Sequence, residues 1–163
     1  DLNKKYIVLC PDSEYGPAKK WPIKKWIDLA NTIQKTYQVV FVGLDSSITS
    51  AASKIGSNNC INLIGKTSLN DAISILSQST CVVSNDSGLM HVAAALDRPV
   101  VGIYGSSSPE YTPPLIENDK KIIIYKNLSC SPCFKRTCPL QHTNCLNNIS
   151  VDSVKESISG LVK

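Results

Sequence analysis

The segment Ser84–His91 carries the side chains best suited to holding a ligand. It spells Ser-Asn-Asp-Ser-Gly-Leu-Met-His and directly follows the apolar run Cys81–Val83. We therefore predict a buried strand that ends in a polar turn and opens onto an apolar helix over residues 88–96. Such a helix start presents free backbone N–H groups and the positive end of the helix dipole, which favour a bound phosphate. With Asp86 and Ser87 beside it, the turn is a candidate ligand site.

These side chains also have an ordinary explanation, because Asp86 and Ser87 are residue types that favour helix N-caps. His91 lies four residues after Ser87, on the same face as the helix start. The remainder of the helix is apolar, so we expect the whole helix, His91 included, to be buried. The face expected to pack on the sheet consists of Leu89, Val92, Ala93 and Leu96. A buried imidazole aimed at the helix start favours a ligand contact; a purely structural histidine is the alternative.

A second polar segment, residues 11–20, follows the apolar run Tyr6–Cys10. Its Lys19 and Lys20 stand just before a helix that Trp21-Pro22 is expected to start. A cation is unfavourable at a helix N-terminus. The two lysines are therefore either a solvated pair or a means of neutralising a diphosphate shared with the polar turn described above.

Short apolar runs alternate with helical patterns along most of the chain. Strands are expected at Tyr6–Cys10, Val39–Val42, Ile61–Ile64, Cys81–Ser84, Val100–Tyr104 and Lys121–Tyr125. Helices are expected from Trp21-Pro22, weakly over 46–55, after a capping box at 68–71, over 88–96 and over about 151–162. The alternation predicts an α/β fold, a doubly wound parallel sheet of Rossmann-like type, in one domain over 1–163. In the strand order 3-2-1-4-5-6 the first and fourth strands are neighbours, with their helices on opposite faces. Loops 11–20 and 85–88 then meet at one edge.

The composition of the 163 residues narrows the class of protein. A hydrophobic content of 42% suits a globular fold, and no apolar run approaches the roughly 18 residues of a membrane span. The net charge of +4 favours an anionic partner, either a phosphorylated small molecule or an anionic membrane surface. No basic stripe with aromatics indicates nucleic acid, and no glycine-rich nucleotide fingerprint, P-loop or nucleophile elbow is present. Without an initiator Met or signal segment, the chain is expected to be a piece of a longer protein.

Two stretches interrupt the alternation. Residues 105–119 form a long proline-bearing loop, and residues 127–150 contain a cysteine cluster. The cluster consists of Cys130, Cys133, Cys138 and Cys145, with His142 among them. Four thiols so close together could hold zinc or iron, but the irregular spacing is also that of reduced thiols or of disulfides formed on oxidation. The other three cysteines, Cys10, Cys60 and Cys81, lie in apolar runs and are expected to be buried thiols in a reducing compartment.

Several long motifs, in the same order, resemble the heptosyltransferases of glycosyltransferase family 9, those of type II in particular. They are Pro-Asp-Ser-Glu-Tyr-Gly-Pro-Ala-Lys-Lys-Trp-Pro (11–22), Ser-Asn-Asp-Ser-Gly-Leu-Met-His-Val-Ala-Ala-Ala-Leu (84–96), Tyr-Gly-Ser-Ser-Ser-Pro (104–109), Tyr-Thr-Pro-Pro-Leu (111–115) and Cys-Ser-Pro-Cys-Phe-Lys-Arg-Thr-Cys-Pro-Leu (130–140). The resemblance runs from about Val8 to Asp152.

The resemblance implies the C-terminal, donor-binding half of a GT-B glycosyltransferase. The whole enzyme would move heptose from ADP-heptose to the lipopolysaccharide inner core with inversion, without a metal or other cofactor. The acceptor site and the catalytic base would lie in the N-terminal half, so this chain alone would be inactive. It would be cytoplasmic, compatible with peripheral contact with the inner membrane. A family 9 enzyme with another sugar donor, or a stand-alone nucleotide-binding module, is the alternative.

The resemblance also implies roles for particular residues. It assigns donor contacts to Ser13, Lys19, Asp45, Lys66, Thr67, Asp86, Ser87, Gly88 and His91. Lys19 would stabilise the diphosphate, Asp45 would lie near the ribose, and the loop of Lys66 and Thr67 would border the adenine.

Overall fold

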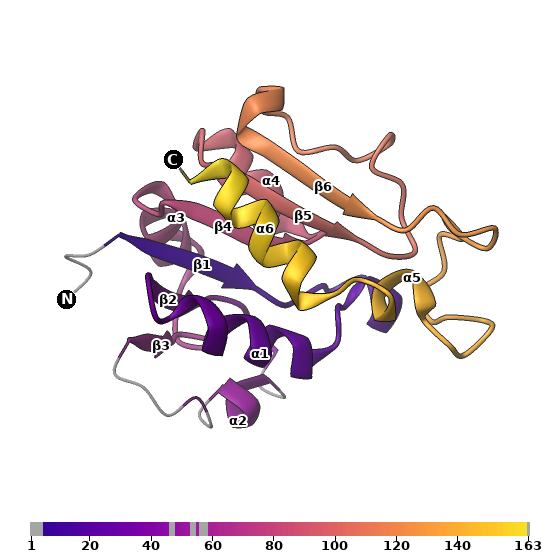
Figure 1. Cartoon of the computed structure of the whole chain (residues 1–163), viewed down its shortest axis with the longest axis horizontal. Coiled ribbons are helices and arrows are strands. Elements are labelled where there is room, and N and C mark those ends of the chain that lie inside the picture. The colour runs from indigo at the N-terminus through magenta and orange to yellow at the C-terminus, as the bar shows by residue number, and fades with distance from the viewer. Residues whose placement is uncertain (1–4, 46–47, 53–54, 56–58, 163) are drawn as a thin grey trace.

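The computed structural model describes residues 5–45, 48–52, 55 and 59–162. Its centre is a six-stranded, all-parallel sheet in the order β3-β2-β1-β4-β5-β6, so the expected fold class and strand order are confirmed (Figure 1). The strands are β1 Tyr6–Cys10, β2 Gln38–Phe41, β3 Cys60–Asn62, β4 Cys81–Asn85, β5 Val100–Tyr104 and β6 Lys121–Tyr125.

Helices cover both faces of the sheet. On one face α1 (Ile23–Ile33) packs beside α6 (Val151–Leu161), and on the other α3 (Leu69–Ser77) packs beside α4 (Gly88–Ala95) (Figure 1). The helices that follow β1 and β4 therefore lie on opposite faces, as predicted. The short elements are α2 (Thr49–Ala52), α5 (Asn144–Asn147) and the 3₁₀ turns η1 (Pro17–Lys19) and η3 (Asn118–Lys120).

The central strands are buried on both sides, which explains why they are continuous apolar runs rather than alternating ones. In β1, Ile7 and Leu9 join the core beneath α1 and α6, whereas Tyr6, Val8 and Cys10 join the core beneath α3 and α4. This alternation follows from the two-residue period of a strand. The result is a rigid layer that fixes where each strand ends.

Several predicted boundaries differ from those observed. β2 lies one residue earlier than expected, and β3 ends at Asn62 instead of Ile64. The Asn62 side chain accepts a hydrogen bond from the N–H of Ile64 (3.1 Å), and this local bond favours a turn over a longer strand. Of the helix expected over 46–55, the structure shows α2; positions 46–47 and 53–54 lie outside the described residues.

All six strands point to one edge of the sheet, where the loops that follow β1, β2, β4 and β5 gather (Figure 1). Helix α6 runs back against β5 and β6, so it ends at the opposite edge, where β1 begins. None of the helices in the described part of the chain is long and apolar enough to cross a membrane.

Candidate functional site

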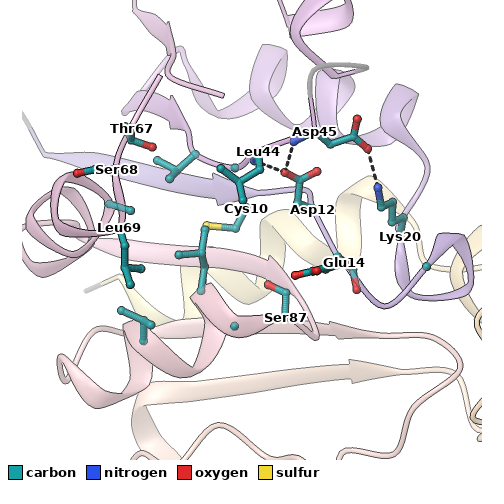
Figure 2. Close-up of a pocket in the computed structure, with 18 residues that line it drawn as sticks. Cys10, Asp12, Glu14, Lys20, Leu44, Asp45, Thr67, Ser68, Leu69 and Ser87 are labelled. Carbon is teal, nitrogen blue, oxygen red and sulfur yellow. Dashed lines mark hydrogen bonds and ion pairs between the residues drawn. The ribbon is translucent and has the colours of Figure 1, made fainter. Parts of the chain in front are cut away.

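A cavity of about 690 Å³ opens at the carboxyl edge, beside the ends of β1, β2 and β4 (Figure 2). Loops or helix starts after four strands contribute to it. Its lining residues are Cys10, Asp12, Ser13, Glu14, Gly16, Lys20, Val42, Gly43, Leu44, Asp45, Thr67, Ser68, Leu69, Ala72, Ser87, Gly88, Leu89 and Val92. A crevice at the switch point of a doubly wound sheet is the expected ligand position.

One part of the cavity is apolar. Cys10 and Val42 come from the ends of β1 and β2, Leu69 from the start of α3, and Leu89 and Val92 from the first turns of α4. Such a wall suits a flat aromatic ring, because ring faces bury apolar area without leaving polar groups unpaired.

Another part is charged. Lys20 Nζ lies 2.6 Å from Asp45 Oδ2, and both side chains line the cavity (Figure 2). Asp12 Oδ2 accepts hydrogen bonds from the backbone N–H groups of Leu44 and Asp45, the second at 2.7 Å. Carboxylates at a cavity wall can accept hydrogen bonds from ligand hydroxyls.

The start of α4 supplies the third part. Ser87 occupies the N-cap position but makes no side-chain capping bond, and its Oγ instead lies 3.1 Å from Ser84 Oγ. The helix start therefore faces the cavity at Ser87 and Gly88 without a side chain covering its N–H groups. This arrangement favours an anion.

Asp86, one residue earlier, is nearly fully buried and joins two loops. Its Oδ2 accepts hydrogen bonds from Lys19 Nζ (2.6 Å) and Ser107 Oγ (2.5 Å), with Thr112 Oγ1 at 3.5 Å. Burial, together with the nearby Asp86 charge, raises the pKa of Tyr104 well above its usual value. The ordinary N-cap explanation for Asp86 does not hold, because its carboxylate is used for the Lys19 ion pair.

The burial predicted for His91 is wrong. The side chain of His91 is 43% exposed, and its Nε2 lies 3.8 Å from Asp86 Oδ1. Of the face of α4 expected to pack on the sheet, Ala93 is buried and Leu89, Val92 and Leu96 pack, partly buried, against the core; Met90 and Ala94 are the other buried residues of the helix. Leu89 and Val92 also border the cavity, and His91 lies on the outward side of the helix.

The residues singled out from the sequence fall into three groups. Ser13, Asp45, Thr67, Ser87 and Gly88 line the cavity. A second group lies next to the cavity without lining it, held together by the buried carboxylate, and consists of Lys19, Asp86 and His91. Lys66 stands apart from both, because its Nζ donates to the carbonyl of Asn62 (3.2 Å) on the surface. Neither Lys19 nor Lys20 is simply solvated, since each has a carboxylate partner.

Sequence reasoning missed Asp12 and Asn85. Asn85 is fully buried; its Nδ2 donates to the carbonyl of Pro11 (2.6 Å) and its Oδ1 accepts from the N–H of Trp21 (3.1 Å). It thereby ties the end of β4 to both ends of the loop after β1. A polar residue closing an apolar strand was the available signal, but its partners are backbone groups more than sixty residues away.

The cysteine-rich segment packs against the loops of the site. Phe134 donates its N–H to the carbonyl of Ser106 (2.7 Å), and Arg136 accepts at its carbonyl from the N–H of Ala18 (3.0 Å). Tyr15 donates its hydroxyl to the carbonyl of Phe134 (2.7 Å). The segment therefore supports the loops that carry Lys19 and Ser107.

The four clustered thiols surround a small cavity of about 20 Å³. Backbone N–H groups, that of Thr143 foremost, hold the pKa of the Cys138 thiol below its usual value, while burial raises that of Cys145. In the described part of the chain, no group of three or more His, Cys, Asp or Glu side chains is arranged so that it could hold a metal ion. All seven cysteines are free thiols; Cys10 and Cys81 are buried as expected, whereas Cys60 is partly exposed.

Fold and site together define a class of protein: a doubly wound α/β domain with an apolar wall, a carboxylate and an uncapped helix start around one cavity at the switch point. Residues 1–144 match the family model of glycosyltransferase family 9 (heptosyltransferase). The chain belongs to this family.

Relatives agree with the family match. The chain is 44% identical over 125 residues to lipooligosaccharide heptosyltransferase 2 of Haemophilus influenzae, covering 72% of this chain and 36% of the relative. It is 46% identical over 116 residues to lipopolysaccharide heptosyltransferase 2 of Salmonella typhimurium, covering 67% of this chain and 33% of the relative. The chain thus spans about a third of the length of these curated relatives.

The solved structure of E. coli ADP-heptose lps heptosyltransferase II has the same fold. It matches with a TM-score of 0.82 at 36% identity, covering 99% of this chain and 47% of that one. The sheet order and the layers described above are therefore those of a GT-B heptosyltransferase half.

Proposed function

We propose that this chain is the donor-binding half of an inverting glycosyltransferase that moves heptose from ADP-heptose to the lipopolysaccharide inner core. One observation carries the proposal: the apolar wall, the Asp45 carboxylate and the open start of α4 surround a single cavity of about 690 Å³. A base, a ribose and a diphosphate need these three environments. The name of the E. coli relative, ADP-heptose lps heptosyltransferase II, supports the choice of donor.

Each part of ADP would have its own contact. The adenine would lie against Leu69, Leu89 and Val92, near the loop of Thr67, and the ribose hydroxyls would donate to Asp45. The diphosphate would lie at the start of α4, by Ser87 and Gly88. Lys19, held by the buried Asp86, would stand next to the β-phosphate, with His91 on the outer side.

In the reaction an acceptor hydroxyl attacks the anomeric carbon of heptose as the bond to the β-phosphate oxygen breaks. Negative charge grows on that oxygen, and fixed N–H dipoles at the helix start together with Lys19 would stabilise it better than water does. The hydroxyl proton would pass to a base in the other half of the enzyme. The scheme uses side-chain and backbone groups alone and requires no cofactor.

We also infer that the enzyme acts in the cytoplasm, with the acceptor presented at the inner membrane. A reducing compartment suits the seven free thiols of the chain. Peripheral contact with an anionic membrane surface suits the net charge of +4.

Calorimetry on this chain tests the donor. We expect ADP to bind, ADP-heptose to bind more tightly, and UDP to bind more weakly than ADP because its smaller base covers less of the apolar wall. Failure to bind ADP would overturn the proposal. ADP binding with no gain from the heptose would instead favour a nucleotide-binding module or a different sugar donor.

A further inference from the structure

Asp12 lies two residues past the end of β1, and its partners lie just past the end of β2. The two strands pair in parallel, with Leu9 opposite Phe41, so the segments that follow them leave the sheet side by side. The Asp12 carboxylate crosses this gap: Oδ2 accepts from the N–H groups of Leu44 and Asp45 (Figure 2). Two consecutive N–H groups on one ionised oxygen form a strong, geometrically specific anchor.

Gly43 makes this close approach feasible. A Cβ atom at position 43 would lie 2.4 Å from Asp12 Oδ2 and 3.0 Å from Asp12 Cγ, a separation that real Cβ contacts do not show. A side chain at position 43 and the Asp12 carboxylate therefore exclude one another. The glycine is required here for space.

The turn is also held by backbone bonds, in which the N–H of Gly65 donates to the carbonyl of Gly43 (2.8 Å) and that of Ile48 to the carbonyl of Asp45 (3.1 Å). Leu44 is 79% exposed, so its side chain does not anchor the turn in a core. Asp45 is half-buried at the cavity wall and reaches Lys20 on the neighbouring loop. The two bonds to Asp12 tie this turn to the loop after β1 and orient the Asp45 backbone N–H at the cavity wall.

We propose that Asp12 is a positioning residue for the donor, which holds the turn after β2 so that Asp45 meets the ribose hydroxyls. Gly43 is the second part of this arrangement, because its lack of a Cβ atom leaves room for the Asp12 carboxylate. This inference rests on the proposed function, in which Asp45 is the ribose contact. It adds a specificity role: the Asp12 anchor makes the pocket select a nucleotide with ribose hydroxyls.

The test compares ADP with 2′,3′-dideoxy-ADP, which keeps the base and the diphosphate, by calorimetry on this chain. We expect the wild-type chain to prefer ADP about tenfold, the size of a hydrogen bond to a charged group. In Asp12→Ala and in Gly43→Ala the preference should fall to within about twofold, because the Asp45 backbone loses its tie to the loop after β1. Affinity for dideoxy-ADP should stay within about twofold in every variant, which also reports that each variant is folded.

A double-mutant cycle sharpens the test. Once Asp12→Ala has removed the carboxylate, the Cβ of residue 12, at an ordinary contact distance of 3.5 Å from a Cβ at position 43, is what remains of this close approach, so the double variant should resemble Asp12→Ala alone. Asp12→Asn retains an acceptor oxygen for the two N–H groups and should restore most of the preference for ADP. Additive losses, an equal loss of dideoxy-ADP binding, or an unchanged ADP preference in Asp12→Ala would each overturn the inference. Failure of the wild-type chain to bind ADP at all would instead overturn the proposed function.

Discussion

At the scale of single residues, the buried carboxylate of Asp86 fixes the position of the Lys19 side chain. Its Oδ2 accepts a hydrogen bond from Lys19 Nζ at 2.6 Å, and only 15% of the lysine side chain is exposed. A flexible lysine loses much rotamer freedom when it binds a phosphate. Here that loss has already occurred on folding, which favours binding to a diphosphate at the helix start.

Replacing Lys19 with Ala in the full-length enzyme should therefore lower turnover by roughly 10²-fold, the effect of losing one donor to a developing oxyanion. Steady-state kinetics with ADP-heptose measures it. Lys24→Ala is the matched control, since Lys24 is an exposed residue of α1 away from the cavity and should behave as wild type. A Lys19→Ala enzyme within a factor of two of wild type would remove the lysine from the mechanism.

At the scale of elements, the start of α3 shapes the cavity through a complete capping box. Ser68 Oγ accepts from the N–H of Asp71, and the Asp71 carboxylate accepts from the N–H of Ser68 at 2.9 Å. The Ser68 hydroxyl also donates to Asp71, and these bonds hold the pKa of Asp71 below its ordinary value. The box fixes Leu69 as part of the cavity wall.

Asp71→Asn should make the free energy of unfolding of the chain less dependent on pH in the acid range. Because the pKa of Asp71 is depressed on folding, its contribution is present above the unfolded value of 3.8 and is lost as the pH falls through the lower folded value. Calorimetric melting of both proteins between pH 7 and pH 3 should show wild type more stable at neutral pH and the difference shrinking in acid. A difference that stays constant with pH would contradict the depressed pKa.

The contact between the cysteine-rich segment and the loop after β1 requires a second glycine, Gly16. Gly16 has φ +149°, and a Cβ there would lie 2.6 Å from the carbonyl oxygen of Arg136. Gly16→Ala should therefore both strain the loop after β1 and push the segment away, lowering the free energy of unfolding by about 1–3 kcal/mol.

Urea denaturation measures the effect of Gly16→Ala. Gly160→Ala is the control, since this residue lies inside α6 and its Cβ would meet only Ile122 Cδ1 at 3.4 Å. Alanine there should leave stability unchanged or raise it by up to about 1 kcal/mol. Equal stability of the Gly16→Ala and wild-type chains would show that the segment is not held at this point.

At the scale of the whole molecule, the sheet order and the cavity position could be predicted because both follow from alternating apolar runs and topology. The exposure of His91 could not. Apolar residues that border a cavity and apolar residues that face a sheet look alike in a sequence; Leu89 and Val92 do both, because they pack partly buried against the core and also line the cavity. Asp12 and Asn85 were missed for another reason, because both act on backbone groups of distant turns.

The chain on its own should bind the donor nucleotide without transferring sugar. We expect ADP at a hundred times its Kd to raise the free energy of unfolding by about 2.7 kcal/mol, as linkage requires. Incubation with ADP-heptose and acceptor should give no product by mass spectrometry. Transfer by this chain alone would show that a catalytic base lies within it and would refute the division of labour between two halves.

The direction of helix α6 across the sheet has a practical consequence. The start of β1 and the end of α6 lie at the same edge of the sheet, and the cavity opens at the other (Figure 1). A tether or dye attached at the start of β1 or at the end of α6 would therefore lie at the edge of the sheet opposite the cavity. Immobilised through one of these two points, the chain would present its cavity to solution, so that the proposed donor binding could be measured on a sensor surface.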